Sequence, residues 1–129
     1  MSNQLMRLDE QAVRWAALGG SILGGGGGGS AVTGAKTGNL ATQFSELYLT
    51  PISQIDPEVI VVTASMVGAP AAKEKYVAPA DVMRCVELFK RSTGLEIGGI
   101  VTNENGGGST FNGWLEASLL GLPLLDPPL

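Results

Sequence analysis

The stretch Val-Ile-Val-Val-Thr-Ala at residues 59–64 decides the fold class. Its β-branched side chains favour an extended strand, since they fit a pleated surface better than a helix. The run is continuously apolar up to Thr63 and shows no alternation with charged residues. Such a run is typical of a strand buried on both faces, in a sheet that helices cover. We therefore expect an α/β fold around this strand.

Helix and strand signals alternate in the second half of the chain. Pro79 fits the first position of a helix, and Gly94 fits its end. A strand over 97–101 follows, then a helix capped by Ser109, then a short strand over 123–126. This alternation favours a mostly parallel sheet with right-handed crossover connections.

The first half is expected to be mainly helical. Asp9 fits the N-cap of a helix that ends near 19–20 or continues to Leu23. A second helix is predicted over 36–45, followed by a strand over 47–50. The fold class expected is therefore α/β, with a mostly parallel sheet flanked by helices and Gly-rich loops at the strand–helix junctions.

Length and composition limit the kind of protein. The 129 residues fit one α/β domain spanning 1–129, and a hydrophobic fraction of 44% provides for a sizeable core. The net charge of −4, without a basic cluster, argues against a nucleic-acid partner. The most apolar stretch, 15–23, is too short to span a bilayer, so no membrane partner is expected. No secretion signal is visible, and the lone Cys85 suits a reducing cytoplasm.

The chain contains no histidine. This excludes a Ser-His-Asp or Cys-His catalytic apparatus built from this chain alone. It also leaves one thiolate and some carboxylates as metal ligands, so no metal site is expected, and the cofactor is unknown.

The strongest candidate site is the Gly-rich loop from Thr102 to Thr110, between an expected strand and an expected helix. Open α/β sheets gather ligands beyond the carboxyl ends of their strands, where helix N-termini offer unpaired N–H groups. The alternative interpretation is a surface turn with a Ser cap. The binding candidates in this loop are Asn103, Asn105, Gly106, Gly107, Gly108, Ser109 and Thr110.

Two further loops are weaker candidates. A Rossmann fingerprint follows a strand, whereas no clear strand precedes the run Gly24–Gly29. The run also lacks the Gly-Lys-Ser/Thr ending of a P-loop. A backbone nest for a ligand and a tight helix-to-helix passage both remain open. The loop after residues 59–64 either holds a ligand or is a simple exit from the strand. The candidates here are Gly26, Gly27, Gly28, Gly29, Ser65 and Gly68.

Two carboxylates lie at the ends of expected strands. Glu96 enters the strand over 97–101, and Asp126 ends the last strand. A carboxyl group beside apolar walls has a raised pKa and can act as a general base, whereas most such residues are only hydrogen-bonded to backbone. Cys85 is interpreted as a buried structural thiol, and Trp15 and Trp114 as core residues.

Four motifs in order carry a resemblance to a known family. They are Ala-Leu-Gly-Gly-Ser-Ile-Leu with six further glycines at 17–29, Ala-Ser-Met-Val-Gly-Ala-Pro at 64–70, Glu-Ile-Gly-Gly at 96–99 and Gly-Leu-Pro-Leu-Leu-Asp at 121–126. Taken together they resemble the N-terminal domain of the S-methyl-thiohydantoin desulfurase-like family, which is associated with hydantoin utilisation.

The resemblance implies part or a subunit of a cytoplasmic hydrolase-like protein acting on cyclic amides of the hydantoin or thiohydantoin type. The alternative is a non-catalytic subunit that binds a small ligand or completes an assembly. Family members continue into a second domain, so the expected partners are a small-molecule substrate, a second domain or partner chain, and further copies of the same chain.

Overall fold

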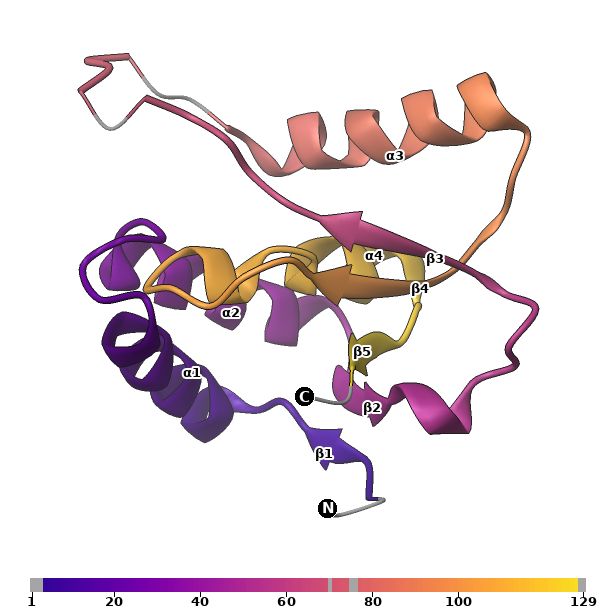
Figure 1. Ribbon diagram of the computed structural model, residues 1–129, viewed down its shortest axis with the longest axis horizontal. Helices are drawn as coiled ribbons and strands as arrows, with labels where there is room; N and C mark the ends of the chain where they lie inside the picture. Colours follow the sequence, from indigo (N-terminus) through magenta and orange to yellow (C-terminus); the bar gives the residue numbers. More distant parts are fainter. Residues whose placement is uncertain (1–3, 70, 75–76, 128–129) are drawn as a thin grey trace.

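The computed structural model describes residues 4–69, 71–74 and 77–127. A five-stranded sheet and four α-helices make up the fold (Figure 1). In chain order the elements are β1 (Met6–Arg7), α1 (Glu10–Leu23), α2 (Ala31–Phe44), β2 (Tyr48–Pro51), the 3-10 turn η1 (Ile52–Gln54), β3 (Ile60–Ala64), α3 (Pro79–Thr93), β4 (Ile97–Thr102), the 3-10 turn η2 (Ser109–Phe111), α4 (Trp114–Leu120) and β5 (Leu124–Asp126).

The sheet is mostly parallel, as the sequence predicts. Its strand order is β1-β2-β5-β4-β3, and only β1 runs antiparallel to its neighbour. The connections through α3 and α4 both join neighbouring parallel strands, as expected for β-α-β units. The register sets Val62 of β3 beside Ile100 of β4, and Ile100 beside Leu124 of β5. The α/β fold class is confirmed.

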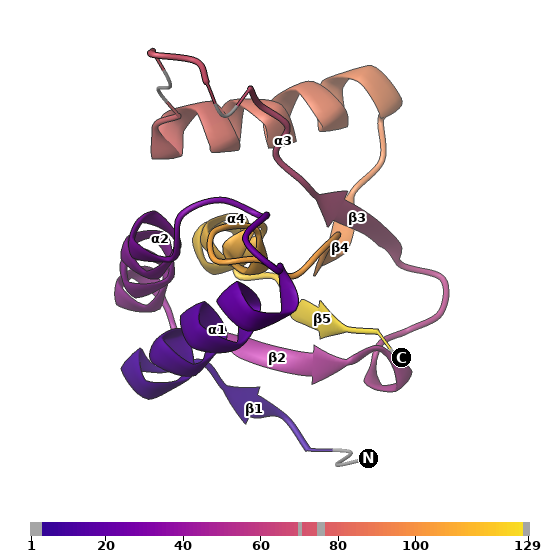
Figure 2. The ribbon, with the colours of Figure 1, turned by 60° about the vertical axis from the view of Figure 1, so that its left-hand side comes forward.

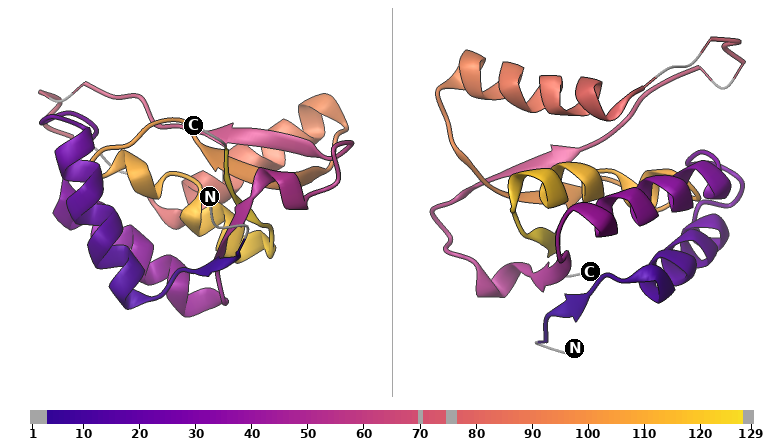
Figure 3. Two further views of the ribbon diagram at one scale, coloured as in Figure 1. Left: turned by 60° about the horizontal axis from the view of Figure 1, so that its bottom comes forward. Right: turned by 180° about the vertical axis from the view of Figure 1, so that it is seen from behind.

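The helices cover one face of this sheet. Figure 2 shows α1, α3 and α4 on the same side of the strands, with α2 stacked outside α1 and α4. Both views in Figure 3 show α1 and α2 side by side. Within the described ranges, no helix is long and apolar enough to cross a membrane.

The expectation that residues 59–64 form a strand buried on both faces is wrong. β3 is an edge strand of the sheet, its Thr63 is exposed, and its other residues are only half-buried. An unbroken apolar run is a property of the strand alone, whereas burial depends on the neighbours that the rest of the chain supplies. The residues therefore predict the strand and not its place in the sheet.

Local signals at helix ends are mostly confirmed. The Asp9 carboxylate accepts a hydrogen bond from the backbone N–H of Ala12 at 3.0 Å, and α1 takes the longer alternative, ending at Leu23. α3 begins at Pro79 and ends before Gly94, which adopts the left-handed conformation.

The start of the last helix differs from the expectation. Ser109 was expected to cap it, but residues 109–111 form the turn η2 and the Ser109 side chain makes no capping hydrogen bond. α4 begins only at Trp114, after Gly113 turns the backbone through the left-handed region at φ 88°. A side chain larger than hydrogen at Gly113 would meet the Ile100 side chain of β4.

The core lies between the sheet and the helices α1, α2 and α4. Its most enclosed side chains include Val13, Ala41 and Leu124, and the rings of Phe111 and Trp114 pack with centroids 4.9 Å apart. Trp114 is therefore a core residue, as predicted. The same prediction is wrong for Trp15, which is 61% exposed, and the burial expected for Cys85 is wrong because that residue is exposed.

Two helical glycines on different helices have opposite surroundings, which gives a matched test of packing. We expect Gly34→Ala to lower the free energy of unfolding by about 1–3 kcal/mol, because the added methyl would overlap the carbonyl oxygen of Gly107 and backbone must move. Gly19→Ala should raise it by about 0.5–1 kcal/mol, because no atom lies within 4 Å and alanine favours the helix. Urea unfolding measures both changes, and shifts of the same sign would contradict the packing described.

One carboxyl group of α4 ties stability to pH. Burial raises the pKa of Glu116, and hydrogen bonds with the backbone at Glu116 and Gly113 offset only part of this effect. The folded state therefore keeps this proton at pH values where the unfolded chain has lost it, so this residue's contribution to stability falls as pH rises above the ordinary glutamate pKa.

We expect Glu116→Gln to stabilise the protein near neutral pH, because an amide cannot ionise in the partly buried position. The gain over the wild type should disappear in acid, below the ordinary glutamate pKa, where both states of the wild type are protonated. Urea unfolding across pH measures it, with Glu58→Gln at an exposed position as control. A gain that is the same at every pH would contradict the pKa shift.

Candidate ligand-binding cleft

The two Gly-rich loops of the chain lie against each other. The carbonyl oxygen of Gly28, between α1 and α2, accepts hydrogen bonds from the backbone N–H groups of Gly108 at 2.7 Å and Ser109 at 2.8 Å. A Cβ atom on Gly28 would come within 2.5 Å of the Gly106 Cα, and Gly28 has a φ of 75°. The contact therefore requires backbone without side chains, and it anchors the loop between β4 and α4.

This contact changes the interpretation of the loop over residues 102–110. The N–H groups of Gly108 and Ser109 were expected to be open to a ligand, but Gly28 already occupies them. The N–H of Gly106 donates to the Thr110 hydroxyl oxygen at 3.0 Å. The Ser109 hydroxyl is buried without a hydrogen-bond partner among the described residues. Residues 24–29 thus form the helix-to-helix passage. Their contact with the second loop occupies the N–H groups of Gly108 and Ser109, which are therefore not open to a ligand.

Beside this contact is a cleft of about 400 Å³, at the carboxyl ends of β4 and β5. Its polar side chains come mainly from the loop that the glycines anchor: Thr102, Asn103, Glu104, Asn105, Thr110 and Asp126. Its apolar walls come from β1, α1, β2, α4 and the last strand: Met6, Leu8, Ala12, Trp15, Ala16, Leu49, Trp114, Leu124, Leu125 and Pro127.

Thr110 connects the anchored backbone to the cleft. Its hydroxyl holds the Gly106 N–H and lies 3.4 Å from the Asn105 Oδ1, to which it donates. At the start of the loop, the Thr102 hydroxyl donates to the carbonyl oxygen of Asn112 at 2.7 Å. Both ends of the loop are therefore fixed by side-chain hydrogen bonds, while Asn103 and Glu104 between them are exposed.

The cleft combines two kinds of surface. Asp126 and Glu104 supply carboxylate acceptors, and the amides of Asn103 and Asn105 supply groups that both donate and accept. Trp15 of α1 forms an exposed aromatic wall. This arrangement suits a small planar ligand that carries both N–H and carbonyl groups. Within the described ranges, no three His, Cys, Asp or Glu side chains are grouped as metal ligands.

Four of the candidates taken from the sequence meet in this cleft. They are Asn103, Asn105, Thr110 and Asp126. The glycines of both loops and Ser109 do not line it. Ser65 and Gly68 lie in the exposed segment after β3 and are also outside it.

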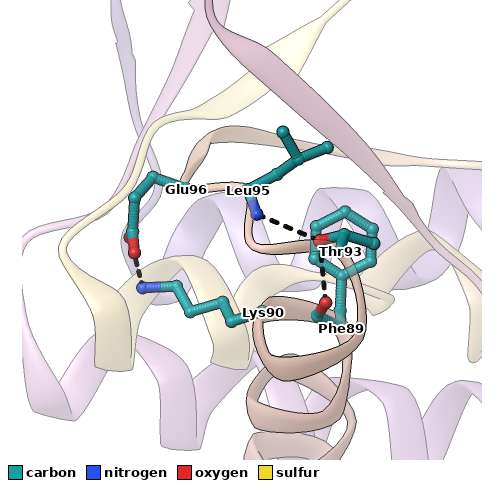
Figure 4. A network of polar contacts seen from close by, with 5 residues as sticks. All are labelled: Phe89, Lys90, Thr93, Leu95 and Glu96. Carbon is teal, nitrogen blue, oxygen red and sulfur yellow. Dashed lines mark hydrogen bonds and ion pairs between the residues drawn. The ribbon is translucent and has the colours of Figure 1, made fainter.

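Glu96 lies at the opposite end of the sheet from Asp126, since it precedes β4 while Asp126 ends the parallel strand β5. Its side chain is 83% exposed and forms an ion pair with the Lys90 ammonium group at 2.6 Å (Figure 4). The apolar walls expected around Glu96 are therefore not present in the structure, and the two carboxylates do not share a site.

Sequence reasoning missed Glu104 and Trp15 as cleft residues. Glu104 stands between Asn103 and Asn105 in the loop already selected, so its position was a usable signal. Nothing local to Trp15 shows that α1 borders the carboxyl ends of the last two strands, because that depends on the tertiary fold.

An α/β domain with a cleft at the carboxyl edge of its parallel strands is the class that the fold and the cleft define. The chain belongs to the S-Me-THD-like, N-terminal domain family, whose model matches residues 11–128. No curated protein and no solved structure matches the chain.

The different surroundings of the two tryptophans give a direct test of the cleft wall. Trp15→Phe leaves only Trp114, which is 4% exposed, so we expect a blue-shifted emission spectrum and weaker quenching by iodide than in the wild type. Fluorescence titration with iodide measures both. Unchanged quenching after the substitution would show that Trp15 does not stand in solvent.

Proposed function

We propose that this chain forms the ligand-binding part of a hydrolase-like protein that acts on cyclic amides of the hydantoin or thiohydantoin type. Two observations support this function. The family is named after S-Me-THD, and the cleft carries amide and carboxylate groups next to an aromatic wall. The convergence of Asn103, Asn105 and Asp126 beside Trp15 is the observation on which the proposal depends.

The chemistry of the ring fits these side chains. A hydantoin is a planar five-membered ring that presents both carbonyl acceptors and N–H donors. Its carbonyl oxygens would accept hydrogen bonds from the Asn103 and Asn105 amides, and a ring N–H would donate to the Asp126 carboxylate. The flat ring would lie against Trp15 and the apolar wall. A cleft of about 400 Å³ is within the range of small-ligand sites.

Hydrolysis of such a ring needs a base for water and a group that stabilises the oxyanion. In this proposal Asp126 takes the proton from water as the water oxygen bonds to the ring carbonyl carbon, and returns that proton to the ring nitrogen as the C–N bond breaks. Glu96 cannot take this role because it lies at the other end of the sheet. The asparagine amides stabilise the oxyanion, since the N–H groups of Gly108 and Ser109 are already bonded to Gly28. A second domain or partner chain supplies the remaining catalytic groups.

A non-catalytic role in ligand binding or assembly is the second candidate. The chain contains no histidine, and the Thr102 and Thr110 hydroxyls in the cleft donate to Asn112 and Asn105 rather than to a base. Binding without turnover is the outcome that distinguishes this role from the first.

We expect the protein to bind hydantoin or 2-thiohydantoin, with Asp126→Asn weakening binding roughly tenfold or more, because a hydrogen bond to a charged group contributes about 1.5–3 kcal/mol. Glu96→Gln is the matched control and should leave the affinity unchanged. Isothermal titration calorimetry measures binding, and release of the opened ring measures turnover. Failure of both rings to bind, or equal loss in both variants, would overturn the proposal.

A further inference from the structure

β3 leaves one row of backbone hydrogen-bonding groups without a partner. The carbonyl oxygen of Ala64 accepts from the Asn103 N–H at 3.4 Å, so the backbone groups of Ala64 face β4. Along a strand these groups point alternately to either side. Those of Val61 and Thr63 therefore point away from β4, and no strand of the described part pairs with them.

The two edges of the sheet differ in how they are protected. β1 at one edge has only two residues, and one of them is Arg7. β3 at the other edge has five residues, and no charged residue occurs from Val59 to Ala69. Short or charged edge strands resist pairing with another chain, whereas long uncharged ones favour it. β3 is therefore the edge that can accept a further strand.

The apolar side of α3 is also incompletely covered. α3 lies on the helix-covered face of the sheet, and in Figures 1 and 2 it is displaced from β4 toward and past β3. No residue of this helix is fully buried, and four of its apolar residues are half-buried: Val82, Met83, Val86 and Phe89. A strand added to β3 would lie next to this apolar side and cover more of it.

We propose that a second copy of this chain pairs with β3 in antiparallel orientation, so that the two sheets become one. A two-fold axis through Val62 pairs all five residues of the strand with their counterparts. Val61 then faces Thr63 of the second copy as a hydrogen-bonded pair, and the outward groups of both residues are used. Because the strand is uncharged, this pairing brings no like charges together.

A second feature fits the same two-fold axis. A hollow of about 420 Å³ lies beside β3; Ser53 and Asp56 contribute to its lining, and the other lining residues are apolar: Ile52, Ile55, Pro57, Val59 and Val61. In the proposed register Val59 faces Ser65 of the second copy. Val67, two residues further along the same extended segment, is 96% exposed and would reach the hollow. Among the described residues, the most exposed large apolar side chain thus meets a largely apolar surface.

The test is the oligomeric state of the full chain and of two variants at one position, by light scattering after size exclusion. Thr63→Pro removes an outward N–H without touching a bond to β4, so it should convert the dimer to a monomer. Thr63→Val keeps the N–H and should remain dimeric. A monomeric wild type would overturn the proposal, and so would a Thr63→Pro variant that stays dimeric.

Cross-linking tests the register and does not depend on the proline variant folding. In a Cys85→Ser background, Val62→Cys places two thiols across the axis, with Cα atoms about 4.5 Å apart, and mild oxidation should give a covalent dimer. Ile60→Cys is the control, because its two copies would be about 13 Å apart along the strands. Cross-linking at Ile60 but not at Val62 would overturn the proposed pairing.

Discussion

The hydrogen bonds from Gly108 and Ser109 to the carbonyl oxygen of Gly28 hold the loops beside the cleft in place. They join the passage between α1 and α2 to the loop between β4 and α4, residues about eighty positions apart in the chain. Through Thr110 and Asn105 the same contact reaches the cleft. In many α/β proteins such backbone N–H groups bind anions, but here the carbonyl oxygen of Gly28 accepts their hydrogen bonds, so the polar groups that line the cleft are side chains.

Local signals were sufficient to locate most elements. Asp9, Pro79 and Gly94 mark helix ends through interactions within one turn of the chain, and the structure has each of them. Ser109 shows the limit of this approach, because a tertiary contact at its N–H replaces the helix start that its side chain predicts. The place of β3 at the edge likewise depends on strands remote in sequence.

The candidate site was only partly predictable, for a related reason. The rule that ligands gather beyond the carboxyl ends of strands selected a loop and a carboxylate, Asp126, that both line the cleft. The same rule excludes Glu96 from the site, because a residue that precedes a strand lies at the amino edge of the sheet. The contribution of Trp15 needed the tertiary arrangement, because α1 borders the cleft from the other end of the chain.

The strand order has a consequence for how the molecule forms. Of the five strands described, β5 comes last in the sequence, yet it lies between β2 and β4 in the middle of the sheet. On the ribosome, the β1–β2 pair and the β3–β4 pair remain two separate halves until β5 emerges. Their union requires contacts of long sequence separation, which makes this a slow and late step in folding. The cleft, which needs Asp126 of β5, therefore appears only after β5 has joined the two halves.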